Sequence, residues 1–101
     1  MVNELYSIVW TKRSMLHLKQ IHDYISEKST QNAAKVIEDI FNEMNKAVAN
    51  PEIYNADKFK TNNDGSYRSF EKHHYRVTYR FHQNVIRVLR IRHTSMEPKL
   101  Y

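Results

Sequence analysis

Two stretches of the chain carry apolar residues at helical spacing. Between residues 12 and 28 the apolar positions lie three or four apart, at Leu18, Ile21 and Ile25, and Thr11 is the expected N-cap. A second helix is predicted from about Gln31 to Ala49, where the sequence Asn50-Pro51 ends it. Its apolar stripe consists of Ala33, Ile37, Ile40, Phe41, Met44, Ala47 and Val48.

Four shorter segments have the β-branched or alternating pattern of strands: residues 5–10, 67–72, 75–81 and 85–92. In the third of these, Tyr75, Val77, Tyr79 and Phe81 alternate with polar residues. The polar connector 51–66 contains a turn at residues 62–65, with a positive φ expected at Gly65. The pattern predicts an α+β fold in the order β-α-α-β-β-β, with a helix hairpin packed on one face of the sheet and the last three strands forming an antiparallel meander.

Composition limits the size and the chemistry of the protein. The chain has 101 residues, no cysteine, one glycine and two prolines, which is typical of a single small domain spanning residues 1–101. Disulfides and cysteine chemistry are excluded. No apolar run approaches the roughly 20 residues that a membrane helix needs, and the N-terminus lacks the pattern of a signal peptide. We therefore expect a soluble cytoplasmic protein that does not interact with a membrane.

The excess of positive over negative charge is confined to the C-terminal half. Residues 1–57 carry six basic and eight acidic side chains, a net charge of −2, whereas residues 58–101 carry ten and three, a net charge of +7. Six of the seven arginines fall between positions 68 and 92. Because arginine suits bidentate contacts with phosphate or carboxylate, this asymmetry predicts a polyanionic partner, either nucleic acid or an acidic protein segment.

Strand register decides which face these arginines occupy. If the loop near residues 82–84 has an odd number of residues, the even-numbered positions of both strands share a face, and Tyr79, Phe81, Leu89 and Ile91 form the core face. An even loop would bury Arg90 and Arg92 among apolar side chains at a cost of several kcal/mol. We therefore expect the odd register, in which Arg80 does not pair with Arg87.

Histidines and tyrosines accompany the arginines and can stack on bases or transfer protons. His93, at the end of the last strand, is equally consistent with a functional and a structural role. His73 and His74 are expected in a turn, and His17 and His22 on solvent-facing helix positions. The single glycine excludes a glycine-rich phosphate loop, no paired-carboxylate or serine-triad arrangement is evident, and we expect neither a metal nor a cofactor.

Three motifs in order carry a family resemblance: Tyr67-Arg68-Ser69-Phe70, Tyr75-Arg76-Val77-Thr78-Tyr79, and the tail Arg92-His93-Thr94-Ser95-Met96-Glu97-Pro98-Lys99-Leu100-Tyr101. Over nearly the whole chain the sequence resembles the RelE/ParE toxins of bacterial type II toxin-antitoxin systems. The resemblance implies a growth-inhibiting toxin neutralised by a cognate antitoxin. RelE-like members cut mRNA on the ribosome without a metal, whereas ParE-like members inhibit DNA gyrase.

The resemblance also implies site residues. The ribonuclease pattern is matched by Arg68, Arg76 and a C-terminal tyrosine, Tyr101, with Arg92 and His93 as further phosphate-binding and proton-transfer candidates. Two departures stand against it: Phe70 replaces a second basic residue, and Thr94 stands where an arginine is expected. Cleavage of ribosome-bound mRNA and binding to gyrase therefore both remain open. The residues expected to bind RNA or another target are Arg80, Arg90 and Lys72.

Overall fold

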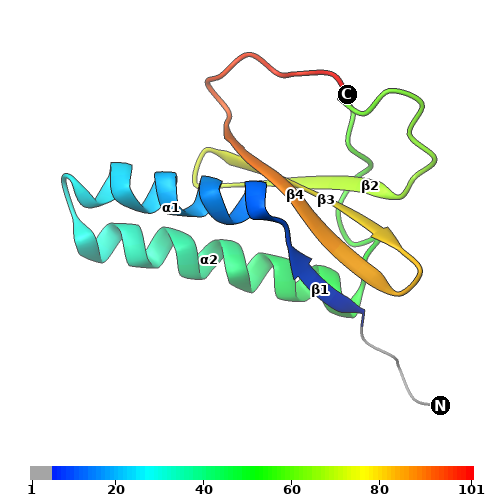
Figure 1. The fold of residues 1–101 in the computed structure, drawn as a ribbon, viewed down its shortest axis with the longest axis horizontal. Coiled ribbons are helices and arrows are strands. Elements are labelled where there is room, and N and C mark those ends of the chain that lie inside the picture. Colours follow the sequence, from blue (N-terminus) through cyan, green and yellow to red (C-terminus); the bar gives the residue numbers. More distant parts are fainter. Residues whose placement is uncertain (1–5) are drawn as a thin grey trace.

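The computed structural model describes residues 6–101 and has the predicted element order (Figure 1). The elements are β1 (Ser7–Trp10), α1 (Lys12–Ser26), α2 (Thr30–Ala49), β2 (Tyr67–Lys72), β3 (Tyr75–His82) and β4 (Val85–His93). The strands form one sheet in the order β1-β4-β3-β2, in which β1 runs parallel to β4 and the other neighbours are antiparallel. The predicted α+β class is confirmed. Leu5, the expected start of the first strand, lies outside the described residues.

Side-chain caps begin both helices. The Thr11 hydroxyl accepts a hydrogen bond from the Ser14 N–H at 3.2 Å, and the Ser29 hydroxyl accepts one from the Asn32 N–H at 3.0 Å. Each bond satisfies a backbone donor that the first helical turn leaves unpaired. The first helix ends at Ser26, slightly before the predicted position, and the second ends at Ala49 as predicted.

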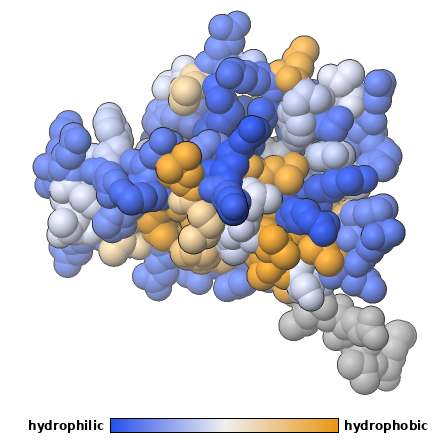
Figure 2. Space-filling model, viewed as in Figure 1, coloured by the Kyte–Doolittle hydropathy of each residue, from blue (hydrophilic) through white to orange (hydrophobic). Residues whose placement is uncertain are grey.

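The two helices lie side by side and cover one face of the sheet (Figure 1). Between them and the sheet lies one apolar core, in which Ile40, Met44, Val77, Tyr79 and Ile86 are completely buried. On the face of the molecule shown in Figure 2, hydrophilic side chains predominate and apolar ones reach the surface in small patches between them. In the described part of the chain, no helix is long and apolar enough to cross a membrane.

One residue of the predicted apolar stripe lies at the edge of this core. Phe41, expected on the buried side of the second helix, is instead partly exposed. Its ring packs against Trp10 of β1, with the two ring centroids 4.8 Å apart. The contact therefore joins the second helix to the edge strand of the sheet.

Both hairpins of the meander turn through two residues with positive φ. These are His73 (51°) and His74 (68°) between β2 and β3, and Gln83 (51°) and Asn84 (63°) between β3 and β4. Two positive φ values at the centre of a two-residue loop match the right-handed twist of the strands. The expected turn at the two histidines is therefore present, and Gly65 has the expected positive φ of 95°.

The predicted register of the β3–β4 hairpin is wrong. Its loop has two residues, so Arg80 pairs directly with Arg87. The register then shifts by one residue, because Tyr79 pairs with Val88 while Thr78 pairs with Arg90, leaving Leu89 as the extra residue of a β-bulge. Beyond the bulge, Arg76 pairs with Arg92. The bulge, rather than an odd loop, keeps the arginines out of the core, and it removes Leu89 from the core face.

Candidate functional site

Five arginines lie on the sheet face opposite the helices. The helix-covered face holds Val77 and Tyr79 from β3, and side chains alternate along each strand, so their neighbours point to the other side. We call this set the arginine face: Arg76, Arg80, Arg87, Arg90 and Arg92. Its residues come from the two central strands, β3 and β4, and all but Arg87 are even-numbered positions that were expected to share a face.

Aromatic rings cover part of the arginine face. Three of its guanidinium groups stack on aromatic rings: Arg76 on Phe59 (4.5 Å), Arg80 on Tyr67 (5.0 Å) and Arg90 on Tyr101 (4.2 Å), measured to the ring centroids. Stacking of this kind is attractive and offsets the mutual repulsion of the cations. The rings belong to the 51–66 connector, to β2 and to the C-terminal tail.

The C-terminal tail is fixed across the arginine face. Arg90 donates to the Lys99 carbonyl at 2.9 Å, and Arg92 donates to the Glu97 carbonyl at 3.3 Å. Tyr101 exchanges backbone hydrogen bonds with the connector, donating to the Phe59 carbonyl (3.1 Å) and accepting from the Thr61 N–H (2.6 Å). In Figure 1 the tail, coloured orange to red, arcs from the end of β4 to the green connector.

A buried carboxylate holds the end of the tail. Asp57 is 2% exposed and accepts a hydrogen bond from the Tyr101 hydroxyl at 2.5 Å and one from the Phe59 N–H at 3.2 Å. Burial, reinforced by this bond to Asp57, raises the pKa of the Tyr101 phenol far above its usual value. The phenol therefore keeps its proton, and its evident role is to anchor the tail.

Sequence reasoning missed Asp57. It is one of several acidic and polar residues in a connector without a regular pattern, and its partner lies 44 positions away. Only the fold brings the two together.

Arg68 and Lys72 lie apart from the arginine face, on the helix side of the sheet. Register places them beside Tyr79 and Tyr75, whose side chains are buried on that side. Arg68 donates to the carbonyls of Gly65 (2.8 Å) and Tyr54 (3.1 Å), so it braces the connector. Lys72 lies 4.0 Å from a carboxylate oxygen of Glu43 on α2. The five candidates from the ribonuclease pattern therefore do not share one face.

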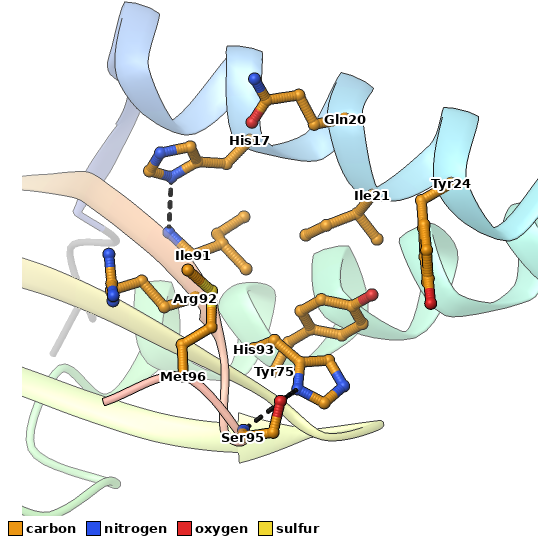
Figure 3. Close-up of a pocket in the computed structure, with 10 residues that line it drawn as sticks. All are labelled: His17, Gln20, Ile21, Tyr24, Tyr75, Ile91, Arg92, His93, Ser95 and Met96. Atoms are coloured by element: carbon orange, nitrogen blue, oxygen red, sulfur yellow. Dashed lines mark hydrogen bonds between the residues drawn. The ribbon is translucent and has the colours of Figure 1, made fainter. Parts of the chain in front are cut away.

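A cavity of about 380 Å³ separates α1 from the end of β4 (Figure 3). We call it the α1–β4 groove. His93 lies on one side of the groove, where its ring meets the Tyr75 ring edge to face, with the two ring centroids 5.1 Å apart. The Arg92 side chain extends toward the opposite rim. The Nδ1 atom of His93 accepts from the Ser95 N–H at 3.0 Å. Adjacent in the strand, Arg92 and His93 point in different directions.

His17 also lines the groove, so its predicted solvent-facing position is wrong. Its Nδ1 atom accepts a hydrogen bond from the Ile91 N–H of β4 at 2.9 Å (Figure 3). Burial, together with the nearby charges of Arg13, Arg92 and Arg90, lowers the pKa of the ring below its usual value. A neutral ring with the proton on Nε2 is the form that can accept this bond. His22 is exposed, as predicted.

The other two histidines discussed above, His73 and His74, form the turn between β2 and β3. His73 contacts Asp39 of α2 through its Nε2 atom at 2.6 Å, which ties the β2–β3 turn to the helix layer. Across residues 6–101, no three histidine or acidic side chains gather as ligands for a metal ion.

Comparisons with known proteins agree with this architecture. Residues 8–98 match the family model described as "ParE toxin of type II toxin-antitoxin system, parDE". No curated protein matches the chain. Among solved structures, the chain is similar to one of the chromosomal ParDE toxin-antitoxin system of P. aeruginosa, with a TM-score of 0.70 and 20% identity over 88% of this chain and 96% of that one.

A second solved structure, the RelBE2 toxin-antitoxin complex of Mycobacterium tuberculosis, gives a TM-score of 0.57 and 18% identity over 89% of this chain and 99% of that one. At such identities the two structures show the shared fold. The family model covers nearly the whole chain, and the chain belongs to the ParE toxin family of type II toxin-antitoxin systems.

Proposed function

We propose that this ParE-family chain inhibits DNA gyrase by binding to it, with no chemical step of its own. One observation carries the proposal: the residues expected to cleave RNA do not converge. Arg68 braces the connector from the helix side of the sheet, and the Tyr101 hydroxyl is held by the buried Asp57. A general acid or base must reach the reacting atoms, and a phenol engaged in this way is unsuited to that role.

The tail supports a binding role. Its backbone is held at Tyr101, Lys99 and Glu97, while the Leu100 side chain is 73% exposed. A well-fixed segment that presents an apolar side chain beside cations loses little conformational entropy when it binds a partner. The family and the two similar complexes also support a cognate antitoxin that neutralises the chain.

A supercoiling assay tests this proposal. Purified protein should block ATP-dependent supercoiling by gyrase, and the purified antitoxin should relieve the block. Replacement of Leu100 with aspartate should weaken inhibition about tenfold, as is usual for a central contact residue. Ile53→Asp makes the same change at another exposed apolar residue, which lies in the 51–66 connector and not in the tail, and it serves as the control. Unimpaired supercoiling at saturating protein would refute the proposal.

Cleavage of ribosome-bound mRNA is the second candidate function. The α1–β4 groove favours it, because His93, Tyr75 and the Ser95 hydroxyl lie together on one side of the groove and Arg92 lines the opposite rim. In a translation extract, cleavage would produce new mRNA ends at codon positions, and replacing Arg76 and His93 with alanine should abolish them. The same two replacements should impair gyrase inhibition less than removal of the tail does.

A further inference from the structure

Part of the arginine face is exposed, and α1 extends it. Arg87 is exposed on β4, and its neighbours Arg80 and Arg90 are half-buried. Arg13, in the first turn of α1, is also exposed, and it lines a cavity of about 380 Å³ together with Arg90 and tyrosine rings from β2 and the tail. We call these four arginines the cationic strip: Arg13, Arg80, Arg87 and Arg90.

The fold brings these cations together against their mutual repulsion. Arg80 and Arg87 are direct cross-strand partners, so their Cβ atoms lie about 5 Å apart, and like charges in such a pair destabilise a sheet. Partial burial, together with the nearby charges of Arg92 and Arg13, lowers the pKa of Arg90. An anion bound to the strip would relieve both effects.

Carboxylates of this chain leave the strip largely unneutralised. In the part of the chain that the structure describes, no carboxylate lies within ion-pair distance of any of the four arginines. Asp64 is connected to Arg80 through the Ser66 hydroxyl, which lies 3.1 Å from the arginine Nε and 2.5 Å from the carboxylate. Asp57, whose charge reaches Arg90, is buried. The strip therefore presents a positive field to an external anion.

Duplex DNA fits the charge and the length of the strip. Protein–DNA interfaces are much more positively charged than protein–protein interfaces. Arg87 and Arg90 lie three positions apart on β4, which is about 10 Å along an extended strand. Each strand of DNA carries a phosphate about every 3.4 Å along the helix axis. Two phosphates of one backbone, about three nucleotides apart, can therefore reach both arginines.

Single-stranded nucleic acid fits the strip less well. Proteins that bind single strands stack the bases on aromatic side chains. The Tyr67 ring beside the strip already holds the Arg80 guanidinium at 5.0 Å and the Lys60 ammonium at 4.8 Å from its centroid. Arg90 likewise lies 4.2 Å from the centroid of the Tyr101 ring. Because the chain's own cations engage these rings, the strip offers charge rather than a stacking platform.

We propose that the cationic strip binds the phosphate backbone of duplex DNA, with one phosphate between Arg13 and Arg90 and another on the Arg80–Arg87 pair. A guanidinium group can donate two parallel hydrogen bonds to phosphate oxygens. Contacts to the backbone carry no sequence information, so the binding is independent of sequence. The inference rests on the proposed function for its role: a chain that holds DNA meets gyrase where gyrase acts.

Fluorescence anisotropy with a short labelled duplex tests the proposal on the purified full chain, without gyrase. Four arginine–phosphate contacts predict that the logarithm of the association constant falls with the logarithm of the salt concentration, with a slope of about −3.6. Two duplexes of unrelated sequence should bind equally, within about twofold.

Single substitutions locate the binding surface. Arg13→Gln and Arg87→Gln each remove one exposed cation, so each should weaken duplex binding about eightfold at about 0.1 M salt and make the slope shallower by about 1. Lys28→Gln is the matched control, since it removes one positive charge from an exposed residue in the turn between α1 and α2. Circular dichroism spectra establish that the variants are folded.

Four outcomes would overturn the proposal. The first is that the duplex does not bind at low salt, and the second is that Lys28→Gln weakens binding as much as Arg87→Gln does. The third is that single-stranded RNA of the same length binds more tightly than the duplex and loses this binding in Arg87→Gln, which would make the strip an RNA site. The fourth is that polyglutamate binds as tightly as the duplex, which would indicate an acidic protein as the occupant.

Gyrase inhibition is measured separately on the same preparations. A chain that binds the duplex as expected but does not block supercoiling would refute the proposed function and leave this inference standing. A chain that blocks supercoiling but does not bind the duplex would refute this inference alone.

Discussion

His17 shows how one side chain can complete a sheet. Its Nδ1 atom accepts the Ile91 N–H where β1 no longer reaches β4. Replacing it with leucine keeps the volume but removes the acceptor, so we expect a loss of about 1–3 kcal/mol in the free energy of unfolding, measured by urea denaturation. Asparagine places an oxygen near the position of Nδ1 and should recover much of that loss. Equal stability of His17→Leu and the original chain would contradict this role.

The same histidine makes stability depend on pH. Burial and three nearby arginines lower its pKa in the folded state, so the unfolded chain binds the proton more readily below about pH 6.5, the ordinary histidine value. The contribution of neutral His17 to the free energy of unfolding is therefore complete above that pH, and it is lost as the pH falls through the folded-state pKa of His17. Urea midpoints measured from neutral to acidic pH should decline, and His17→Asn should decline less steeply. Parallel curves for the two proteins would count against this assignment.

At the scale of elements, the β3–β4 hairpin accommodates two conflicting demands. Its two-residue turn puts Arg80 opposite Arg87. If this register continued without a shift along the two strands, the side chains of Arg90 and Arg92 would point into the core. The bulge at Leu89 resolves the conflict. Gln83 occupies a left-handed conformation that asparagine tolerates better, so Gln83→Asn should stabilise the protein by up to about 1 kcal/mol, and Gln83→Val should destabilise it. Urea denaturation of the two variants tests this prediction, and equal free energies of unfolding would contradict it.

The hydroxyl of the last residue helps to hold the C-terminal tail in place. Tyr101→Phe removes the hydroxyl that the buried Asp57 accepts, so the backbone bonds of Tyr101 with Phe59 and Thr61 should open more often. We expect amide exchange at residues 61 and 101 to accelerate about tenfold, the effect of about 1.4 kcal/mol. Leu100→Asp alters an exposed tail residue and should leave these rates unchanged. Unaltered exchange in Tyr101→Phe would show that the phenol does not hold the tail.

For the whole molecule, binding of the antitoxin should stabilise the folded chain, and the positive charge of the chain should make this effect depend on salt. A ligand that binds only the folded state stabilises it by about 2.7 kcal/mol when the free ligand concentration is 100 times the dissociation constant. The antitoxin should therefore raise the unfolding temperature of this chain. Because residues 58–101 carry a net charge of +7, the gain in unfolding temperature should shrink as salt is added. A salt-independent gain would show that apolar contacts alone hold the complex.

Much of the fold follows from local pattern. The apolar stripe from Ala33 to Val48 determined a helix, and proline at position 51 determined its end. Alternation in residues 75–81 was enough to separate Arg76 and Arg80 from the core tyrosines. These features depend on neighbours in sequence, and the physics of helix periodicity and strand pleating is local.

Only the tertiary structure decided how the arginines are used. Whether a chain forms a two-residue turn with a bulge or a three-residue turn depends on packing across the sheet, which a single strand does not encode. The bond between Tyr101 and Asp57 spans 44 positions, and the one from Ile91 to His17 spans 74. The sequence by itself determined a basic sheet beneath two helices and its family. The folded chain determined that the tail covers this sheet and that α1 meets β4 in a groove, because both result from contacts between distant residues.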